Sequence, residues 1–173
     1  MKRVTIILAI IMTLIINNNN EKIIIPNEAI RVRIIANSNS SYDLEVKENL
    51  RNEIEKKIYN LLKNITNIDE ARKILINNIE DIEIEIEKNF NKQNYHNKFD
   101  VDYGLNYFPE KEFKGVIYKE GYYESLVVTI GNGEGNNWWC VLYPPLCALE
   151  FDETNKSDIE YQSFISEIIN KYL

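Results

Sequence analysis

The sequence is poor in the residues on which most enzyme and metal sites depend. It has one histidine, His96, and two cysteines, Cys140 and Cys147, among 173 residues. A His-dependent triad therefore has at most one candidate residue, and two cysteines are too few ligands for a typical structural zinc site. His96 lies in a polar stretch, 92–98, which predicts a solvated loop. Asp-Thr-Gly, Asp-Ser-Gly, His-Glu-x-x-His and Gly-x-Ser-x-Gly motifs do not occur. We expect a protein that is not an enzyme and holds no metal or cofactor.

An excess of positive charge is also lacking. The chain has 20 basic and 27 acidic side chains, a formal net charge of -7. Nothing in this balance attracts a phosphate backbone, so binding to nucleic acid is disfavoured. The apolar fraction of 45% and the charged fraction of 27% are those of an ordinary globular protein. A chain of this length predicts one domain with a tail at one or both ends.

A hydrophobic run of full membrane length is absent, but a shorter one opens the chain. Lys2 and Arg3 precede apolar residues 4–16, and asparagines end the run. A basic start before a short apolar run is typical of a secretory signal, whereas a membrane span needs about 20 residues. No Ala-x-Ala pattern follows, so the segment predicts export without predicting cleavage and would also serve as a membrane tether. The chain then divides into a signal or anchor segment, a linker and one domain: 1–20, 21–29 and 30–173.

Helical periodicity dominates the first half of this domain. Residues 30–35 first alternate apolar and basic side chains, which predicts a strand exposed on one face at its start and buried towards its end. Polar residues 37–40 break the strand and suit a helix cap. Apolar residues every three to four positions then predict an amphipathic helix over 42–64 and a second from about 69 to 90.

The second half of the domain has the two-residue period of strands. Residues 99–107 alternate apolar and polar side chains up to Pro109, and 122–130 and 138–143 predict two further strands. The tail, 157–173, suits a closing helix, although a strand also fits its beginning. The sequence therefore predicts an α+β fold: a single domain with two amphipathic helices packed on a small, mostly antiparallel sheet, and a short C-terminal helix.

Glycine alternates with polar residues in one loop, Gly131-Asn132-Gly133-Glu134-Gly135-Asn136. Phosphate-binding loops expose backbone N–H groups at the start of a helix, but an aromatic strand-like segment follows here. The Gly-Lys-Ser/Thr ending of a P-loop is also missing. The loop is better interpreted as a turn that reverses the chain, because Gly and Asn tolerate positive φ.

Both tryptophans of the chain follow this turn, side by side. Neighbours on a strand point to opposite faces, so one can enter the core while the other faces outwards; burial of both is the alternative. An outward Trp is a frequent anchor of protein interfaces. We expect the surface that contacts a partner to include Asn136, Asn137, Trp138, Trp139, Tyr143, Pro144 and Pro145.

The two cysteines lie close together in the sequence, at the end of this aromatic segment. In an exported protein such spacing predicts a disulfide between Cys140 and Cys147. A nucleophilic role for Cys140 would need a base to lower its pKa, and His96 is the one histidine on offer. Structural pairing is the better interpretation.

Two stretches of the sequence resemble the stage II sporulation protein R family. Residues 30–40, Ile-Arg-Val-Arg-Ile-Ile-Ala-Asn-Ser-Asn-Ser, are similar to its N-terminal motif, and 121–147 are similar to its central motif. The segment Tyr107-Phe108-Pro109 also fits. This sequence departs from the family where Arg33 replaces the usual His and Asn39 the usual Asp.

The resemblance implies a signalling protein. Members of the family are made in the forespore and exported into the space between the two sporangial membranes. There they trigger a membrane-embedded aspartic protease of the mother-cell membrane, which cleaves the precursor of sigma-E. The implied partner is that protease, and the implied location is extracytoplasmic, free or membrane-anchored. Two alternatives stay open: a cell-wall hydrolase, which would need a cleft with convergent carboxylates, and a membrane-tethered structural protein of the sporangium.

Overall fold

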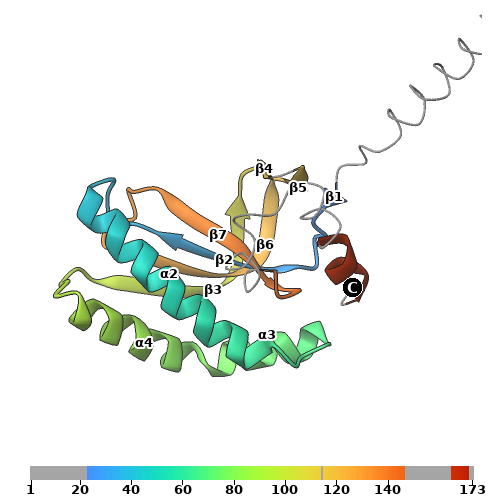
Figure 1. The fold of residues 1–173 in the computed structure, drawn as a ribbon, viewed down its shortest axis with the longest axis horizontal. Coiled ribbons are helices and arrows are strands. Elements are labelled where there is room, and N and C mark those ends of the chain that lie inside the picture. Colours follow the sequence, from blue (N-terminus) through green and yellow to red (C-terminus); the bar gives the residue numbers. More distant parts are fainter. Residues whose placement is uncertain (1–22, 114, 147–164, 172–173) are drawn as a thin grey trace, which may run out of the picture.

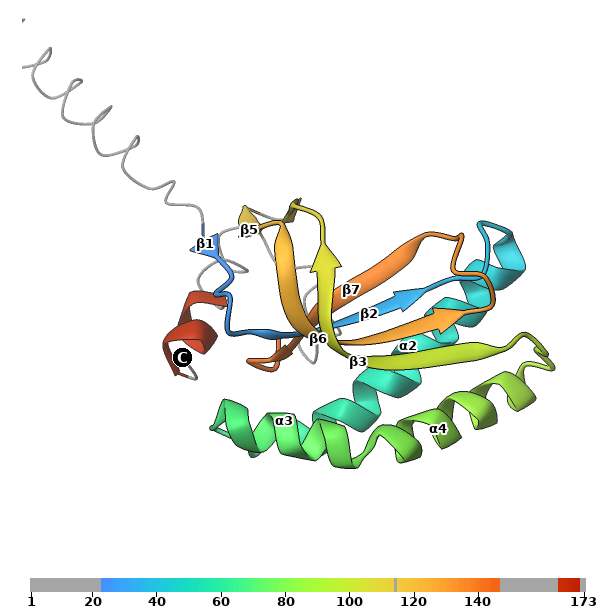
Figure 2. The ribbon, with the colours of Figure 1, turned by 180° about the vertical axis from the view of Figure 1, so that it is seen from behind.

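A four-stranded sheet with helices on one face forms the centre of the computed structural model of this protein (Figure 1). The fold is α+β and forms a single domain, as the sequence predicts. The helices lie together along one face of the sheet, and a small second sheet stands at one end of it (Figure 2). The structure describes residues 23–113, 115–146 and 165–171.

The main sheet joins one early strand to three late ones. Strands β2 (Ile30–Ile35), β3 (Phe99–Phe108), β6 (Gly121–Ile130) and β7 (Asn137–Tyr143) lie in the order β3-β6-β2-β7. β2 pairs in parallel with β6 and antiparallel with β7, and β3 pairs antiparallel with β6. Antiparallel pairing therefore predominates in this sheet, and each strand lies where the sequence predicts it.

The connection from β6 to β7 is not the hairpin that the turn chemistry suggests. The chain does reverse at 131–136, but β7 pairs with β2, which lies between β6 and β7. Residues 131–136 must therefore pass over the end of β2 and span two strand spacings, about 10 Å. A two-residue turn is too short for this crossing.

Three helices cover one face of the sheet, where two were expected. α2 (Ser41–Leu62) agrees with the predicted 42–64, and the Ser40 hydroxyl caps it by accepting a hydrogen bond from the Asp43 N–H, 3.1 Å away. The predicted second helix is divided into α3 (Ile68–Asn77) and α4 (Ile79–Lys92). The division is at Asn78, whose backbone leaves the helical region and whose side-chain N–H donates to the Ile74 carbonyl.

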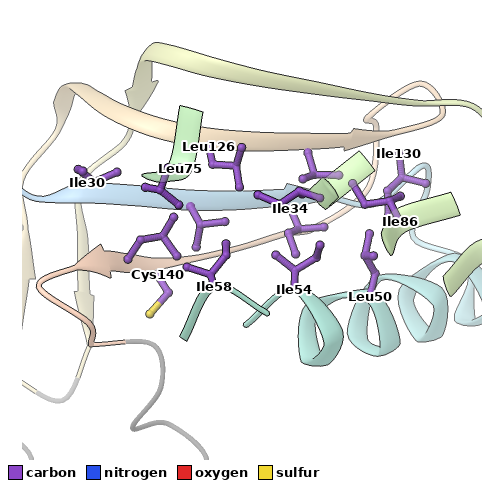
Figure 3. Close-up of a cluster of buried hydrophobic side chains, with 14 of the residues drawn as sticks. Ile30, Ile34, Leu50, Ile54, Ile58, Leu75, Ile86, Leu126, Ile130 and Cys140 are labelled. Atoms are coloured by element: carbon purple, nitrogen blue, oxygen red, sulfur yellow. The ribbon is translucent and has the colours of Figure 1, made fainter. Parts of the chain in front are cut away.

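Apolar residues that recur every two positions in the strands and every three to four in α2 meet between the layers (Figure 3). Burying each such Ile or Leu side chain contributes roughly 1.5–3 kcal/mol relative to leaving it exposed. This burial fixes which face of each strand turns towards the helices. The contributing residues include Ile30, Ile34, Leu50, Ile54, Ile58, Leu75, Ile86, Leu126 and Ile130.

The small second sheet lies at the end of the main sheet away from the start of α2 (Figures 1 and 2). It contains β1 (Ile23–Ile24), β5 (Val116–Tyr118) and β4 (Lys111–Phe113), in the order β1-β5-β4. The described part of the expected linker, 23–29, is thus packed against the domain, and its Ile25 side chain is fully buried.

The closing helix expected near the C-terminus is present over 165–171. Ile165 and Ile168 pack with Ile25, Val116 and Leu146 in a second apolar cluster. Among the described residues, no helix is both long enough and apolar enough to cross a bilayer. The expected signal segment, 1–20, lies outside them.

Candidate functional site

Two polar loops lie against each other at the end of the main sheet where α2 begins. They are residues 36–40, after β2, and residues 131–136, before β7; we call them the loop pair. Backbone bonds join them, from the Glu134 N–H to the Asn37 carbonyl (3.1 Å) and from the Gly135 N–H to the Ala36 carbonyl (2.9 Å). The two loops therefore form one hydrogen-bonded surface, although they are distant in sequence.

Asparagine side chains add further hydrogen bonds to the loop pair, in which their side-chain oxygens accept from backbone N–H groups as a backbone carbonyl would. The Asn37 side-chain oxygen accepts a hydrogen bond from the Asn132 N–H at 3.1 Å, and that of Asn39 accepts one from the Asn136 N–H at 2.7 Å. The sequence identifies these asparagines only as turn formers. Nothing in the sequence around them predicts that they bind a loop so far along the chain.

Glycine is required in the loop pair by close packing. Gly131 has φ +56°, and a Cβ on it would overlap the Asn37 side chain. A Cβ on Gly135 would overlap the Ser38 carbonyl group. The Gly-rich stretch therefore acts as the turn that the sequence predicts, and its glycines also admit the neighbouring loop.

Asp43 anchors the loop pair to α2. Its carboxylate is buried and accepts hydrogen bonds from the Ser38 hydroxyl, the Tyr95 hydroxyl (2.6 Å) and the Asn37 side-chain N–H (3.0 Å). These donors stabilise the charged form, Ser38 most strongly, and lower the pKa of Asp43 from 3.8 to about 2. Burial, together with the bond to Asp43, raises the pKa of Tyr95 to about 12.

We expect Asp43→Asn to lower the free energy of unfolding by about 1–3 kcal/mol near neutral pH, because an amide cannot accept from all these donors. The folded-state pKa of Asp43 is depressed, so its contribution is present above about pH 4 and is lost as the pH falls through about 2. The difference between parent and variant should therefore shrink towards pH 2. Urea unfolding at several pH values measures this.

Asp100→Asn is the matched control, because Asp100 is exposed on β3. It should leave the free energy of unfolding within about 0.5 kcal/mol of the parent. A difference between parent and Asp43→Asn that stays constant from neutral pH to about pH 2 would contradict the assignment.

The outer side of the loop pair is exposed and polar. Because internal hydrogen bonds fix the backbone beneath these side chains, they form a surface that is ordered before any partner arrives. The exposed residues on the loop pair and at the adjoining start of β7 are Asn39, Ser40, Asn132, Glu134, Asn136 and Asn137.

The two tryptophans on β7 point to opposite faces of the sheet, as the strand period predicts. Trp138 packs against the core under the helices, with the Arg51 guanidinium 5.8 Å from its ring centroid. Trp139 lies on the other face against Phe108 and Tyr118, at ring-centroid distances of 5.3 and 5.7 Å. Both side chains are half-buried.

The expected partner-contact residues are not equally accessible. Asn136 and Asn137 are exposed, whereas Tyr143 is fully buried and Pro144 is buried. Pro145 is half-buried. The first two can touch a partner directly, and the buried ones support the strand that carries them.

Cys140 is buried on β7, 6% exposed, on the side of the helices (Figure 3). Cys147 lies outside the described residues, so the disulfide stays a prediction. If the chain is exported, as the sequence predicts, we expect it to be about 2 Da lighter without reductant than with it, because a disulfide forms with loss of the hydrogen of each thiol. Intact mass spectrometry measures this, with Cys147→Ser as the control. Two free thiols in the exported chain would contradict it.

The sequence prediction was wrong about Arg31. The alternation in 30–35 suggests an exposed basic face, but Arg31 is fully buried and Arg33 is half-buried. Aromatic side chains from distant segments cover Arg31.

His96 lies in an exposed loop, as predicted. The described residues include no group of three His, Cys, Asp or Glu side chains arranged to hold a metal ion.

Comparison with known proteins identifies the family. The family model described as "Stage II sporulation protein R (spore_II_R)" matches residues 26–153, and this description names a sporulation stage and no reaction. A curated relative, the "Stage II sporulation protein R" of Bacillus subtilis (strain 168), is 39% identical over 134 residues. The match covers 78% of this chain and 60% of that protein, so the chain spans about three fifths of the relative's length.

No solved structure matches the chain significantly. The family match includes the strands that flank the loop pair, β2, β6 and β7, and both loops themselves. The family that residues 30–40 and 121–147 resemble is therefore confirmed, and the structure brings these two segments together. The chain belongs to the stage II sporulation protein R family.

Proposed function

We propose that this chain is an exported signalling protein that activates a membrane-embedded aspartic protease, which processes the precursor of sigma-E during endospore formation. Membership of the family supports the proposal, because the resemblance implies this role. The observation that carries it is the meeting of the two family motifs in one ordered, exposed polar surface, the loop pair. A preordered surface of this kind suits the binding of a protein partner.

The chemistry of the loop pair favours binding over catalysis. The buried carboxylate beside the loop pair is that of Asp43 on α2, and several donors hold its pKa at about 2. A carboxylate of such low basicity is a poor general base near neutral pH. We therefore propose that the chain acts as a ligand and is not an enzyme.

The arrangement of the fold suits a chain that reaches from one membrane towards another. β1, where the described chain begins, lies at one end of the long axis, and the start of α2 beside the loop pair lies at the other (Figures 1 and 2). If residues 1–20 direct export from the forespore and remain as a tether, the loop pair would face away from the tethering membrane. In this proposal it meets the protease in the mother-cell membrane.

Reconstitution in growing cells of a spore-forming bacterium tests this function. The full chain, the protease and the sigma-E precursor are produced together, and the precursor and its product are followed by immunoblot. We expect processing when all three are present. A protease lacking its catalytic aspartate and a chain lacking residues 1–22 should each abolish it. An exported, folded chain that leaves the precursor uncut beside a competent protease would refute the proposal.

A further inference from the structure

A buried, unpaired arginine lies on the face of the main sheet opposite the helices. We call this the open face; it carries Arg31 and Arg33 of β2, and Ser125 of β6, the cross-strand neighbour of Arg31. Arg31 is fully buried. None of its three guanidinium nitrogens has a hydrogen-bond partner among the described residues. A buried charge without a partner is costly and needs an explanation.

Aromatic rings surround Arg31 but do not satisfy it. Its Cζ atom lies 3.4 Å from the ring centroid of Tyr123, with Phe108 and Trp139 rings at 5.3 and 5.7 Å. Stacking engages the flat faces of a guanidinium, whereas its N–H groups point outwards in the plane of the group. The rings therefore leave the hydrogen-bonding edge of Arg31 unused.

Further unused donors lie beside it. The Ser125 hydroxyl is fully buried, and neither it nor the Arg33 Nε atom has a partner among the described residues. Arg33 makes one hydrogen bond, from Nη1 to the Tyr107 carbonyl at 3.3 Å. Its Cζ atom lies 5.9 Å from the Phe108 ring that Arg31 also contacts. Two positive charges thus share one aromatic neighbour.

No carboxylate of the described residues forms an ion pair with either arginine. Burial lowers the pKa of both arginines; for Arg31 the neighbouring Tyr123 and Tyr118 side chains oppose this shift only in part. Water could occupy the free N–H groups, but water does not neutralise two neighbouring cations. An anion satisfies both the donors and the charge, and a carboxylate matches a guanidinium edge with two parallel hydrogen bonds.

We propose that Arg31, Arg33 and Ser125 form a carboxylate-binding site on the open face of the main sheet. Arg33 is half-buried and gives the site its contact with solvent. The carboxylate comes either from a small acid in solution or from an acidic side chain of a protein partner. The site is independent of the proposed activation of the protease.

Thermal melting of the full chain in mild detergent tests the site. Sodium acetate replaces sodium chloride at constant ionic strength, and neutral acetamide is the control solute. We expect acetate to raise the melting temperature saturably, by about 3–6 °C at ten times its dissociation constant. Acetamide should have no such effect. Arg33→Met should lose the shift, whereas Arg51→Gln, on the surface of α2, should keep it.

Arg31→Met gives a second readout. In chloride alone it should melt at or above the temperature of the parent, because an apolar side chain of similar size replaces an unpaired buried charge. Acetate should then fail to stabilise it. Arg33→Met decides the question if Arg31→Met does not fold.

Two peptides distinguish the sources of the carboxylate: acetyl-Gly-Glu-Gly-amide and its neutral Gln counterpart. If a partner's side chain is the ligand, the Glu peptide raises the melting temperature at lower concentration than acetate does, and the Gln peptide does not. If a small acid is the ligand, acetate is the more effective. A parent that melts identically with chloride, acetate and both peptides, or variants that shift as the parent does, would overturn the site.

Discussion

Gly135→Ala should lower the melting temperature by roughly 6–12 °C, equivalent to about 3 kcal/mol for a chain of this size. The added Cβ would overlap the Ser38 carbonyl group, which is backbone and cannot rotate away. To make room, the loops must separate, and the bond from the Gly135 N–H to the Ala36 carbonyl is lost. Differential scanning calorimetry of the full chain measures the change.

Gly104→Ala is the matched control, on β3. A Cβ there would have the Asp102 side chain 3.7 Å away as its nearest neighbour, an ordinary contact. The variant should melt at or slightly above the temperature of the parent, because alanine restricts the unfolded chain more than glycine does. Equal melting temperatures for the two variants would show that the loops are not packed as described.

If the chain activates the protease as proposed, Asn137→Arg should reduce processing of the sigma-E precursor at least tenfold while leaving the fold unchanged. Asn137 is exposed at the start of β7, beside the loop pair, so the longer charged side chain can extend into solvent in the free protein. In a complex it would have to be desolvated against the partner. Immunoblots of the reconstituted system, with the melting temperature checked in parallel, measure the two effects.

Asn77→Arg provides the same substitution elsewhere. Asn77 is exposed at the end of α3, where a positive charge is compatible with the helix dipole. This variant should support processing at the parental level. If both arginine variants process normally, the partner does not cover the start of β7, and the proposed contact surface must be abandoned.

Local pattern alone predicted most of the elements. The two-residue period in 99–107 and the three-to-four-residue period in 42–64 correspond to β3 and α2 within a few residues. The division at Asn78 was missed because the apolar stripe continues through it: Leu75 and Ile82 are both buried in the same core. Periodicity reports which face is buried, and a helix can break without changing that face.

Long-range pairing was the part that local pattern could not supply. A turn at 131–136 is visible in the sequence, but the insertion of β2 between the strands that the turn joins is not. Arg31 was missed for a related reason. The rings that cover it belong to β3, β6 and β7, and alternation of apolar and basic residues is normally a sign of a half-exposed strand.

The sequence points to one half of the candidate site and not to how that site is built, and the contact with a partner stays a prediction. The segment 136–146 was identified by its aromatic and proline content, yet its exposed members are Asn136 and Asn137. The other half of the site, 36–40, was interpreted as a strand break and helix cap. The cap at Ser40 is confirmed, but nothing in the local sequence indicates that Asn37 and Asn39 bind a loop 95 residues or more away.

The central position of β2 makes the order of synthesis matter. If the chain is exported from its N-terminus, as proposed, β2 arrives early, whereas the strands that flank it, β6 and β7, arrive late. Loops closed over such distances form late, because chain entropy opposes them until most of the chain is present. The loop pair can therefore assemble only after β7 has been delivered. On the proposed function, a chain stopped before β7 would therefore lack the loop pair and would carry no signal.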